Sequence, residues 1–304
     1  MYDIIIIGAG PAGLTAAIYA RRAGYKTLVF EAAFPGGQMT QTPDIENYPG
    51  FELVTGFELS SNMHNQAASL GAQFITDQVL EILPGNPQTL RTSTASYQCK
   101  SVILAMGAYR RTLDCPGEAQ FTGRGVSYCA TCDGGFFKGK TVCIVGGGDT
   151  ALEDAIYLSN ICERVYLIHR RDQFRAKSIL QSSVKSRENI QFIPDSVVTS
   201  ITGDTSVKTC EIKNVKTGQT QALATSAVFV AVGTIPKTDL VAGLVDTDKS
   251  GFIMAGEDCK TSRPGIMAAG DLRTKPIYQI VTATADGATA IHAASQYIDS
   301  LENS

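Results

Sequence analysis

The sequence predicts an α/β protein of two domains, and three observations lead to this prediction. The chain twice repeats the order of apolar strand, glycine-rich turn, small-residue helix and second strand. Its 304 residues exceed the roughly 100–200 residues of a single domain. Its composition, 44% hydrophobic and 18% charged with 29 glycines, fits a globular α/β protein and excludes the disordered, collagen-like and coiled-coil classes.

The first repeat comprises the apolar run Ile4 to Ile7, the turn "GAGPAG", the helix pattern "LTAAIYARRAG" and the strand "KTLVF". Gly8 permits a tight turn, Gly10 lets a pyrophosphate approach the backbone, and Gly13 lets the helix pack close to the strand. The helix N-terminus offers unpaired N–H groups and positive dipole to phosphates. Glu31 ends the second strand, where it can accept hydrogen bonds from a ribose. This context predicts a Rossmann-like unit that suits FAD, rather than a glycine-rich turn of another α/β fold.

The second repeat reads "TVCIV", "GGGDTA", "ALEDAIYLSNI" and "RVYLI", and runs into "HRRDQFR". Gly146, Gly148 and Ala151 match the pattern G-x-G-x-x-A. Each repeat also has a candidate closing strand, "VILAMGA" (Val102 to Ala108) in the first and "VFVAVGT" (Val228 to Thr234) in the second. Such strands reach the sheet edge that faces a bound cofactor. Two related, three-layer Rossmann-like domains are therefore expected.

The residue at the ribose position distinguishes the two repeats. Glu31 follows Gly8 by 23 residues, and His169 follows Gly146 by the same 23 residues. Three arginines come after this histidine: Arg170, Arg171 and Arg175. An acid favours a free 2′-hydroxyl, whereas arginines bind a 2′-phosphate through bidentate, charge-assisted hydrogen bonds. The second domain therefore suits NADPH. A solvated helix start is the alternative for the arginine run, and the matched register argues against it.

Two stretches are candidate linkers between these domains. Pro116 and Gly117 interrupt regular structure in "RRTLDCPGEAQ", and a second stretch runs from Pro236 to about Gly251. The segment after it is too short for a comfortable core of its own. We expect it to rejoin the first domain, which makes the second domain an insertion.

Cys129 and Cys132 stand in "SYCATCDGG", two residues apart and directly before Asp133. A zinc site requires four ligands, but the sequence has no second Cys-x-x-Cys, and its three histidines lack ligand spacing. A structural disulfide over so short a loop removes little entropy from the unfolded chain. The spacing favours redox exchange, in which one thiolate attacks a partner's disulfide and the other resolves the mixed disulfide.

Asp133 is the predicted proton donor of this pair. Partial burial raises the pKa of a carboxyl group into the range of a general acid. Helix capping is the alternative role, because aspartate is a good N-cap.

Charge and targeting signals exclude several classes of partner. The net charge of −3 gives no general attraction to nucleic acid or anionic lipid. The chain opens on a strand-like run without a signal sequence, and it has no transmembrane span. We therefore expect a cytoplasmic protein whose remaining cysteines are ordinary buried thiols.

Six motifs together resemble those of the low-molecular-weight thioredoxin reductases, over essentially the full length and in the family order. They are "GAGPAG", "GGQMTQTPDIENYPG", "CATCDG", "GGGDTALEDA", "HRRDQFRA" and "GIMAAGDLRTKPIYQIVTATADGA". The resemblance implies an FAD domain formed by residues 1–113 and 245–304, with an NADPH domain at 114–244 that carries the cysteines. It further implies a homodimer joined largely through the FAD domains.

The resemblance also implies the activity. Electrons pass from NADPH to FAD, then to the Cys129–Cys132 disulfide, and finally to the disulfide of thioredoxin or a thioredoxin-like protein. Cys132 is implied to lie next to the flavin and Cys129 to attack the partner. Because one domain holds both NADPH and the disulfide, and both need the flavin, that domain is expected to swing about its linkers, as it does in the family.

The two glycine-rich turns, together with the residues that the resemblance implies, give the expected cofactor-binding residues. Those for FAD are Gly8, Gly10, Pro11, Ala12, Gly13, Glu31, Gly37, Gln38, Asn47, Ala105, Gly107, Gly270, Asp271, Gln279 and Ile280. Those for NADPH are Gly147, Gly148, Asp149, Thr150, Ala151, His169, Arg170, Arg171 and Arg175. The chain departs from the family pattern at Met106, where a threonine is usual, and at Tyr278, where an arginine is frequent.

Three other functions compete with this hypothesis. A relative passes electrons to a peroxidase, but it usually carries an additional N-terminal redox domain that this sequence lacks. A dithiol oxidase passes electrons to oxygen and lacks the "HRR" cluster that is present here. A redox sensor would bind nucleotide and signal through the disulfide without turnover.

Overall fold

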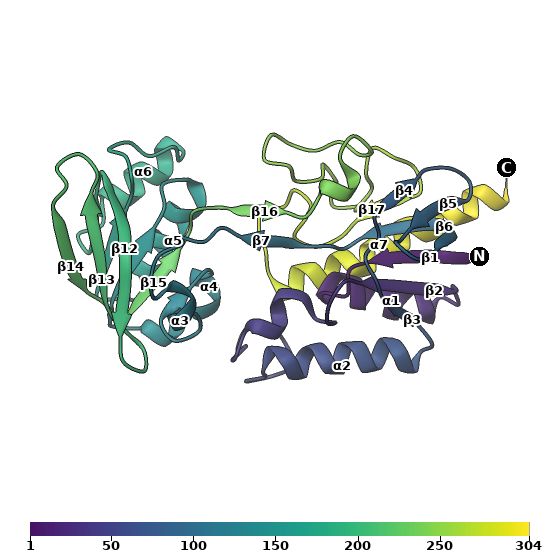
Figure 1. Ribbon diagram of the computed structural model, residues 1–304, viewed down its shortest axis with the longest axis horizontal. Coiled ribbons are helices and arrows are strands. Elements are labelled where there is room, and N and C mark those ends of the chain that lie inside the picture. Colours follow the sequence, from purple (N-terminus) through teal and green to yellow (C-terminus); the bar gives the residue numbers. More distant parts are fainter. Residues whose placement is uncertain (304) are drawn as a thin grey trace. The chain divides into compact units, whose positions relative to one another are not determined.

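The computed structural model describes residues 1–303. The chain folds into two compact units (Figure 1). The first unit contains Met1–Tyr109 and the residues from Ile235 onward, and the second unit contains Arg110–Thr234. The chain crosses between them in strands β7 (Ala108–Arg110) and β16 (Thr234–Pro236), which pair with each other.

The unit boundaries fall before the predicted domain boundaries at 113/114 and 244/245. Val241 and Val245 are buried in a core cluster of the first unit, which is why the chain has already rejoined that unit at residue 235. The stretch from Pro236 to Gly251, interpreted from sequence as a linker, is therefore part of the first unit.

A seven-stranded sheet forms the centre of the first unit, in the order β3-β2-β1-β6-β5-β4 with β17 paired to β6. The strands are β1 (Tyr2–Ile7), β2 (Thr27–Glu31), β3 (Gln73–Thr76), β4 (Glu81–Leu83), β5 (Gln88–Arg91), β6 (Ser96–Leu104) and β17 (Ile266–Ala268). Ile4 and Ile6 enter one core cluster, while Ile5 and Ile7 enter another. Because successive side chains of a strand point to opposite faces, β1 is buried on both sides.

Helices accompany this sheet. They are α1 (Pro11–Arg22), α2 (Gly56–Ser69), α7 (Ile280–Glu302) and the short 3₁₀ segments η1 (Gly37–Gln41) and η3 (Asp239–Val241). The side chain of Thr55 caps α2 by accepting the Glu58 N–H at 3.1 Å. Gln279 and Thr282 form a reciprocal capping box at the start of α7.

The second unit has a parallel sheet of order β11-β10-β9-β15-β8 and an antiparallel sheet of order β12-β13-β14. The parallel strands are β8 (Val126–Ser127), β9 (Thr141–Val145), β10 (Arg164–Ile168), β11 (Ile190–Ile193) and β15 (Ala227–Val230). The antiparallel strands are β12 (Ser196–Gly203), β13 (Val207–Asn214) and β14 (Thr220–Ala224). Its helices are α3 (Glu118–Phe121), α4 (Ala130–Asp133), α5 (Asp149–Ser159), α6 (Ser178–Lys185) and the 3₁₀ turn η2 (Gly134–Phe137).

Both predicted repeats fold as strand, turn, helix and strand, through β1-α1-β2 and β9-α5-β10. The closing strands are β6, beside β1, and β15, beside β9, and both pairings are parallel. The predicted fold class, an α/β protein with Rossmann-like units, is confirmed. Within residues 1–303, no helix is both long enough and apolar enough to cross a bilayer.

Candidate redox and dinucleotide-binding sites

Cys129 and Cys132 form a disulfide at the start of α4, directly after β8. Cys129 is the N-cap of this helix, and its Sγ accepts the Cys132 N–H at 3.2 Å. The Asp133 N–H donates to the Cys129 carbonyl at 3.1 Å. Hydrogen bonds therefore fix both the backbone and one sulfur of the loop.

Asp133 lies at the end of α4, and its Oδ2 accepts a 2.5 Å hydrogen bond from the Ser127 hydroxyl. Burial raises the pKa of Asp133, although the Ser127 hydrogen bond and the charge of Arg110 act in the opposite direction. The side chain of Asp133 makes no capping bond to η2, and Cys129 caps α4. Asp133 therefore does not serve as a side-chain N-cap here, and its role as a proton donor remains a prediction.

A buried carboxylate, not singled out from the sequence, fixes the chain beside this loop. Glu118 is 3% exposed and accepts the N–H groups of Leu113 and Asp114. It also accepts the hydroxyl of Tyr128, the residue before Cys129, at 2.9 Å. Burial is the main cause that raises the pKa of Tyr128 to about 12, so this hydroxyl stays a donor.

The glycine-rich turn of the first unit has the expected geometry. Gly8 has a φ of 105°, and a Cβ on this residue would overlap the Ala105 carbonyl. A Cβ on Gly13 would overlap the Gly8 carbonyl, whereas one on Gly10 would have no described atom within 4 Å. Gly8 and Gly13 thus make the turn compact, and Gly10 leaves open space beside it.

Glu31 ends β2 beside this turn. Its two carboxylate oxygens accept the N–H groups of Ala9 at 2.8 Å and Ala33 at 3.1 Å. Glu31 therefore orders the turn itself. Its binding of a ribose remains a prediction, which its further lone pairs allow.

Two other residues predicted for FAD, Gly37 and Gly270, lie against the same turn. A Cβ on Gly37 would lie 3.4 Å from the Gly10 Cα, and one on Gly270 would lie 3.0 Å from the Ala12 Cβ. Farther along the chain, the Asn47 amide donates to Gln279 at 3.2 Å, just before Ile280 begins α7. The Gln38 amide bonds the Ala108 carbonyl, near Gly107.

A buried ion cluster, not anticipated from the sequence, lies behind Gly270. Asp286 is 5% exposed and accepts the Gly270 N–H at 2.8 Å. It also binds two nitrogens of Arg273 and the Lys275 ammonium at 2.9 Å. Burial acts to raise the pKa of Asp286, but these partners outweigh it and hold the pKa below its usual value. The cluster thereby fixes the turn that precedes Asp271.

In the second unit, the glycine-rich turn lies against His169. A Cβ on Gly147 would overlap the His169 ring. The ring is buried, and its Nε2 has no hydrogen-bond partner within residues 1–303. Burial, followed by the charge of Arg175, lowers the pKa of His169, so the ring is neutral at pH 7. A buried polar nitrogen is usually hydrogen-bonded, so a ligand atom or a water is the expected partner of His169 Nε2.

The arginine segment is tied to the glycine-rich turn. The Arg175 N–H donates to the Gly147 carbonyl at 2.8 Å, and Asp149 accepts the Lys177 N–H at 2.8 Å. The three predicted arginines line one pocket together with Asp172, Asp195 and Lys216. Three of the predicted residues, Gly148, Thr150 and Ala151, form the start of α5 and its N-cap.

Lys216 was not identified from the sequence. It follows β13, and its ammonium pairs with Asp172 at 3.1 Å and with Asp195 at 2.9 Å. Its positive charge thus neutralises part of the negative charge of the two carboxylates, in a pocket that the arginines make positive. No local motif marks such a residue, because it approaches the pocket from another sheet.

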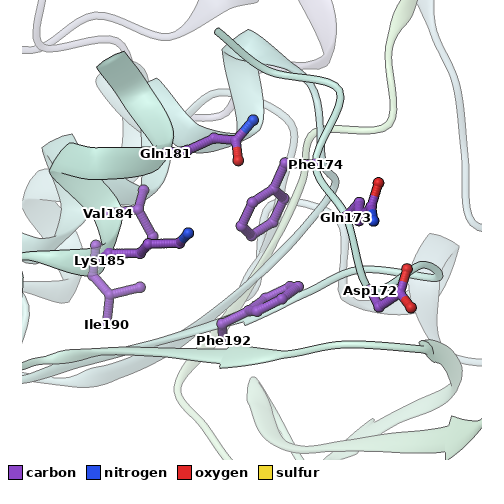
Figure 2. A pocket seen from close by; sticks show the side chains of 8 residues that line it. All are labelled: Asp172, Gln173, Phe174, Gln181, Val184, Lys185, Ile190 and Phe192. Carbon is purple, nitrogen blue, oxygen red and sulfur yellow. The ribbon is translucent and has the colours of Figure 1, made fainter. Parts of the chain in front are cut away.

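A second cavity of about 330 Å³ lies behind the same segment (Figure 2). The rings of Phe174 and Phe192 face each other in it, with centroids 4.3 Å apart, beside Val184 from α6 (Figure 2). Phe174 also stacks on His169, with centroids 5.9 Å apart. This aromatic row anchors the arginine segment to the core. Within the described part of the chain, no cluster of three or more His, Cys, Asp or Glu could hold a metal ion.

Known proteins resemble this chain over its whole length. Residues 2–287 match the family model described as pyridine nucleotide-disulphide oxidoreductase. A thioredoxin reductase of Treponema pallidum is 44% identical, with 99% of each chain covered. A bifunctional thioredoxin reductase/thioredoxin of Mycobacterium leprae is 41% identical over 98% of this chain and 66% of its own. The crystal structure of thioredoxin reductase from Streptococcus pyogenes superposes with a TM-score of 0.94 at 45% identity, covering 99% of each chain.

Proposed function

Because the chain belongs to the pyridine nucleotide-disulphide oxidoreductase family, we propose that it is an NADPH-dependent thioredoxin reductase. One observation carries this proposal: a Cys-x-x-Cys disulfide stands beside a carboxyl of raised pKa, in a unit with an arginine-flanked dinucleotide turn. The full-length relatives with this name support the same activity.

FAD fits the first unit. The open space at Gly10 admits a pyrophosphate, and Glu31 ends β2 where a ribose would lie. Asp271 follows the Gly270 turn that Asp286 holds in place. Bound there, FAD would supply the redox chemistry that links NADPH to the disulfide.

NADPH fits the second unit. Arg170, Arg171 and Arg175 supply the charge for a 2′-phosphate, and the open space at Gly148 admits the pyrophosphate. The buried Nε2 of His169 is available for a hydrogen bond with the bound nucleotide. Neutral histidine can serve there as donor or acceptor, according to its tautomer.

The protein's own chemistry is thiol–disulfide exchange. Two electrons break the Cys129–Cys132 bond and leave two sulfurs that require protons or remain thiolates. The Cys129 thiolate attacks a sulfur of the partner's disulfide, which forms a mixed disulfide and releases one partner thiolate. Cys132 then attacks the Cys129 sulfur, which re-forms the internal disulfide and releases the second. Asp133 protonates a departing thiolate.

The partner is thioredoxin or a thioredoxin-like protein. The bifunctional relative of M. leprae, which joins the two names in one chain, supports this assignment. Free thiols elsewhere in the chain support a reducing compartment, the cytoplasm. The proposal includes a homodimer that forms through the first unit. It also includes a rotation of the second unit about the chain crossings at 109/110 and 234/235.

Replacement of Cys132 by serine tests the assigned pair. The Cys132→Ser protein should bind both cofactors and still show NADPH-dependent bleaching of the flavin, but should not reduce thioredoxin. Cys115→Ser, which alters a half-buried thiol outside the pair, is the matched control and should retain turnover. Thioredoxin reduction by Cys132→Ser would refute the assignment, and slow bleaching of the wild type would favour a sensor or an oxidase.

A further inference from the structure

Ser127 joins the proposed proton donor to the backbone of the redox loop. We propose that Ser127 is a positioning residue whose hydroxyl holds Asp133 beside Cys129 and turns between two acceptors as Asp133 gains and loses its proton. The inference rests on the proposed role of Asp133 and goes beyond it, because it assigns the group that sets the geometry of that acid.

The geometry of Ser127 supports this role. The residue is 5% exposed and lies in β8, where it pairs with Phe229 of β15 in the parallel sheet. Its Oγ lies 2.5 Å from Asp133 Oδ2 and accepts the Cys129 N–H at 3.1 Å. The same Oγ lies 3.3 Å from the Cys129 carbonyl oxygen. A strand of the sheet thus places one hydroxyl between the acid and the cysteine.

A serine hydroxyl carries one hydrogen and two acceptor lone pairs. Ser127 Oγ therefore cannot donate to Asp133 and to the Cys129 carbonyl at the same time. When Asp133 is ionised, the single hydrogen belongs on the 2.5 Å contact, because a carboxylate is the stronger acceptor. The Cys129 carbonyl then keeps the Asp133 N–H as its donor.

Protonation of Asp133 reverses the direction of the short hydrogen bond. The acid now donates to Ser127 Oγ, and the serine hydrogen turns to the Cys129 carbonyl at 3.3 Å. The acid gives its proton to a departing thiolate after its O–H turns from Ser127 Oγ toward that sulfur, and the serine hydrogen then returns to the new carboxylate. The proton is conserved in this sequence, which requires rotation of the two O–H groups. Ser127 thus keeps Asp133 in place in both states.

The positive charge of Arg110, in β7, acts to lower the pKa of Asp133. It acts in the same direction on Asp154 of α5, the helix that packs against α4. Burial, followed by the neighbouring Glu153, raises the pKa of Asp154 to about 7. Tyr128 belongs to the Glu118 network and stays protonated. Ser127 is the neutral hydrogen-bond donor that reaches the Asp133 carboxylate in this group.

The pH dependence of thioredoxin reduction by the FAD-loaded enzyme tests the inference. A hydroxyl that donates to a carboxylate favours its ionised form, so its removal raises the pKa of the acid. The alkaline limb of the Ser127→Ala profile should therefore move to higher pH, with a lower maximal rate. Ser127→Thr, which keeps the hydroxyl, should restore the wild-type limb. Ser196→Ala, which removes another buried hydroxyl of the second unit, should leave the limb in place.

Asp133→Asn separates this inference from the proposed function. That variant should lose about 10²-fold or more in rate. If it does, and the Ser127→Ala limb coincides with the wild-type limb, Ser127 only fills space and the inference fails. If Asp133→Asn keeps the wild-type rate and limb, the acid role fails and this inference fails with it. NADPH bleaching of the flavin shows that each variant is folded. If Ser127→Ala does not fold, Ser127→Val, which has the shape of threonine without the hydroxyl, is compared with Ser127→Thr: a limb at higher pH in Ser127→Val supports the inference, and coincident limbs overturn it.

Discussion

Asp286 shows how one residue organises a turn that is distant in the sequence. It receives four hydrogen bonds, from the Gly270 N–H, two nitrogens of Arg273 and the Lys275 ammonium. Ser127 and Glu118 act in the same way in the second unit, where each accepts backbone N–H groups of the loop that it orders. Single buried polar groups therefore set the positions that the two sites depend on.

Removal of the Asp286 carboxylate should destabilise the protein strongly. Asp286→Ala leaves the buried cations of Arg273 and Lys275 uncompensated, which costs about 3–5 kcal/mol when a buried pair is broken. Urea unfolding measures the loss. Asp299→Ala, at an exposed site on the same helix, is the control and should change the free energy of unfolding by less than about 0.5 kcal/mol. Equal stabilities of the two variants would contradict the prediction.

Asp286 also predicts a pH dependence of stability. Its pKa is lower in the folded than in the unfolded protein, so its contribution is present above the unfolded pKa. This contribution should disappear as the pH falls below about 4 and through the folded pKa. Urea unfolding at a series of pH values should show that Asp286→Asn lacks this part of the wild-type acid sensitivity. If the free energies of unfolding of the wild type and of Asp286→Asn depended on pH with the same slope in this range, the prediction would be wrong.

At the scale of elements, local patterns predicted more than pairings between distant segments did. The two strand, turn and helix repeats could be predicted because their periodicity and glycines lie within about 30 residues. The hairpin that carries Lys216 to the arginine pocket could not, because β12, β13 and β14 form a separate sheet. The Asp286 cluster could not be predicted for a similar reason. Asp286 lies sixteen residues after Gly270, and no sequence motif connects the two positions.

The first glycine-rich turn allows folding and cofactor binding to be separated. Gly13→Ala should destabilise the apo-protein by about 1–3 kcal/mol, because the new methyl group overlaps the Gly8 carbonyl. Gly10→Ala meets no described atom within 4 Å, so it should keep the stability of the apo-protein but lose FAD. The absorbance of flavin per chain and urea unfolding measure the two effects. Full flavin content in Gly10→Ala would place the pyrophosphate elsewhere.

The arginine pocket should distinguish the two nicotinamide cofactors. Neutral glutamines at positions 170 and 171 should cost about 1.5–3 kcal/mol per charged hydrogen bond lost in kcat/KM for NADPH, with little effect for NADH. Lys216→Ala should also lower kcat/KM for NADPH, because it leaves the carboxylates of Asp172 and Asp195 without their cation beside the proposed 2′-phosphate. This loss should be about 1 kcal/mol at most, because the ion pairs of Lys216 are exposed. Equal losses for both cofactors would exclude a 2′-phosphate at this pocket.

On the scale of the whole molecule, one unit carries both the disulfide and the proposed NADPH site. The proposed relay then requires that unit to present the disulfide and NADPH in turn to the flavin. A short lysine-reactive crosslinker tests this requirement. Chains crosslinked between residues 110–234 and the remainder, identified by mass spectrometry, should lose thioredoxin reduction, while chains crosslinked within one unit should keep it. Unchanged turnover in the first group would exclude the swing.

Because the crossing strands β7 and β16 pair with each other, the second unit can be exchanged as one continuous segment of the chain. The Arg111 N–H donates to the Gly233 carbonyl at 3.0 Å, so the two ends of the inserted unit meet. On the host side, the Lys237 N–H donates to the Gly107 carbonyl at 2.9 Å. An insertion whose ends adjoin adds no separation between the parts of its host. The gene segment for residues 110–234 could therefore be exchanged as a cassette between relatives, with each half of the enzyme retaining its own core.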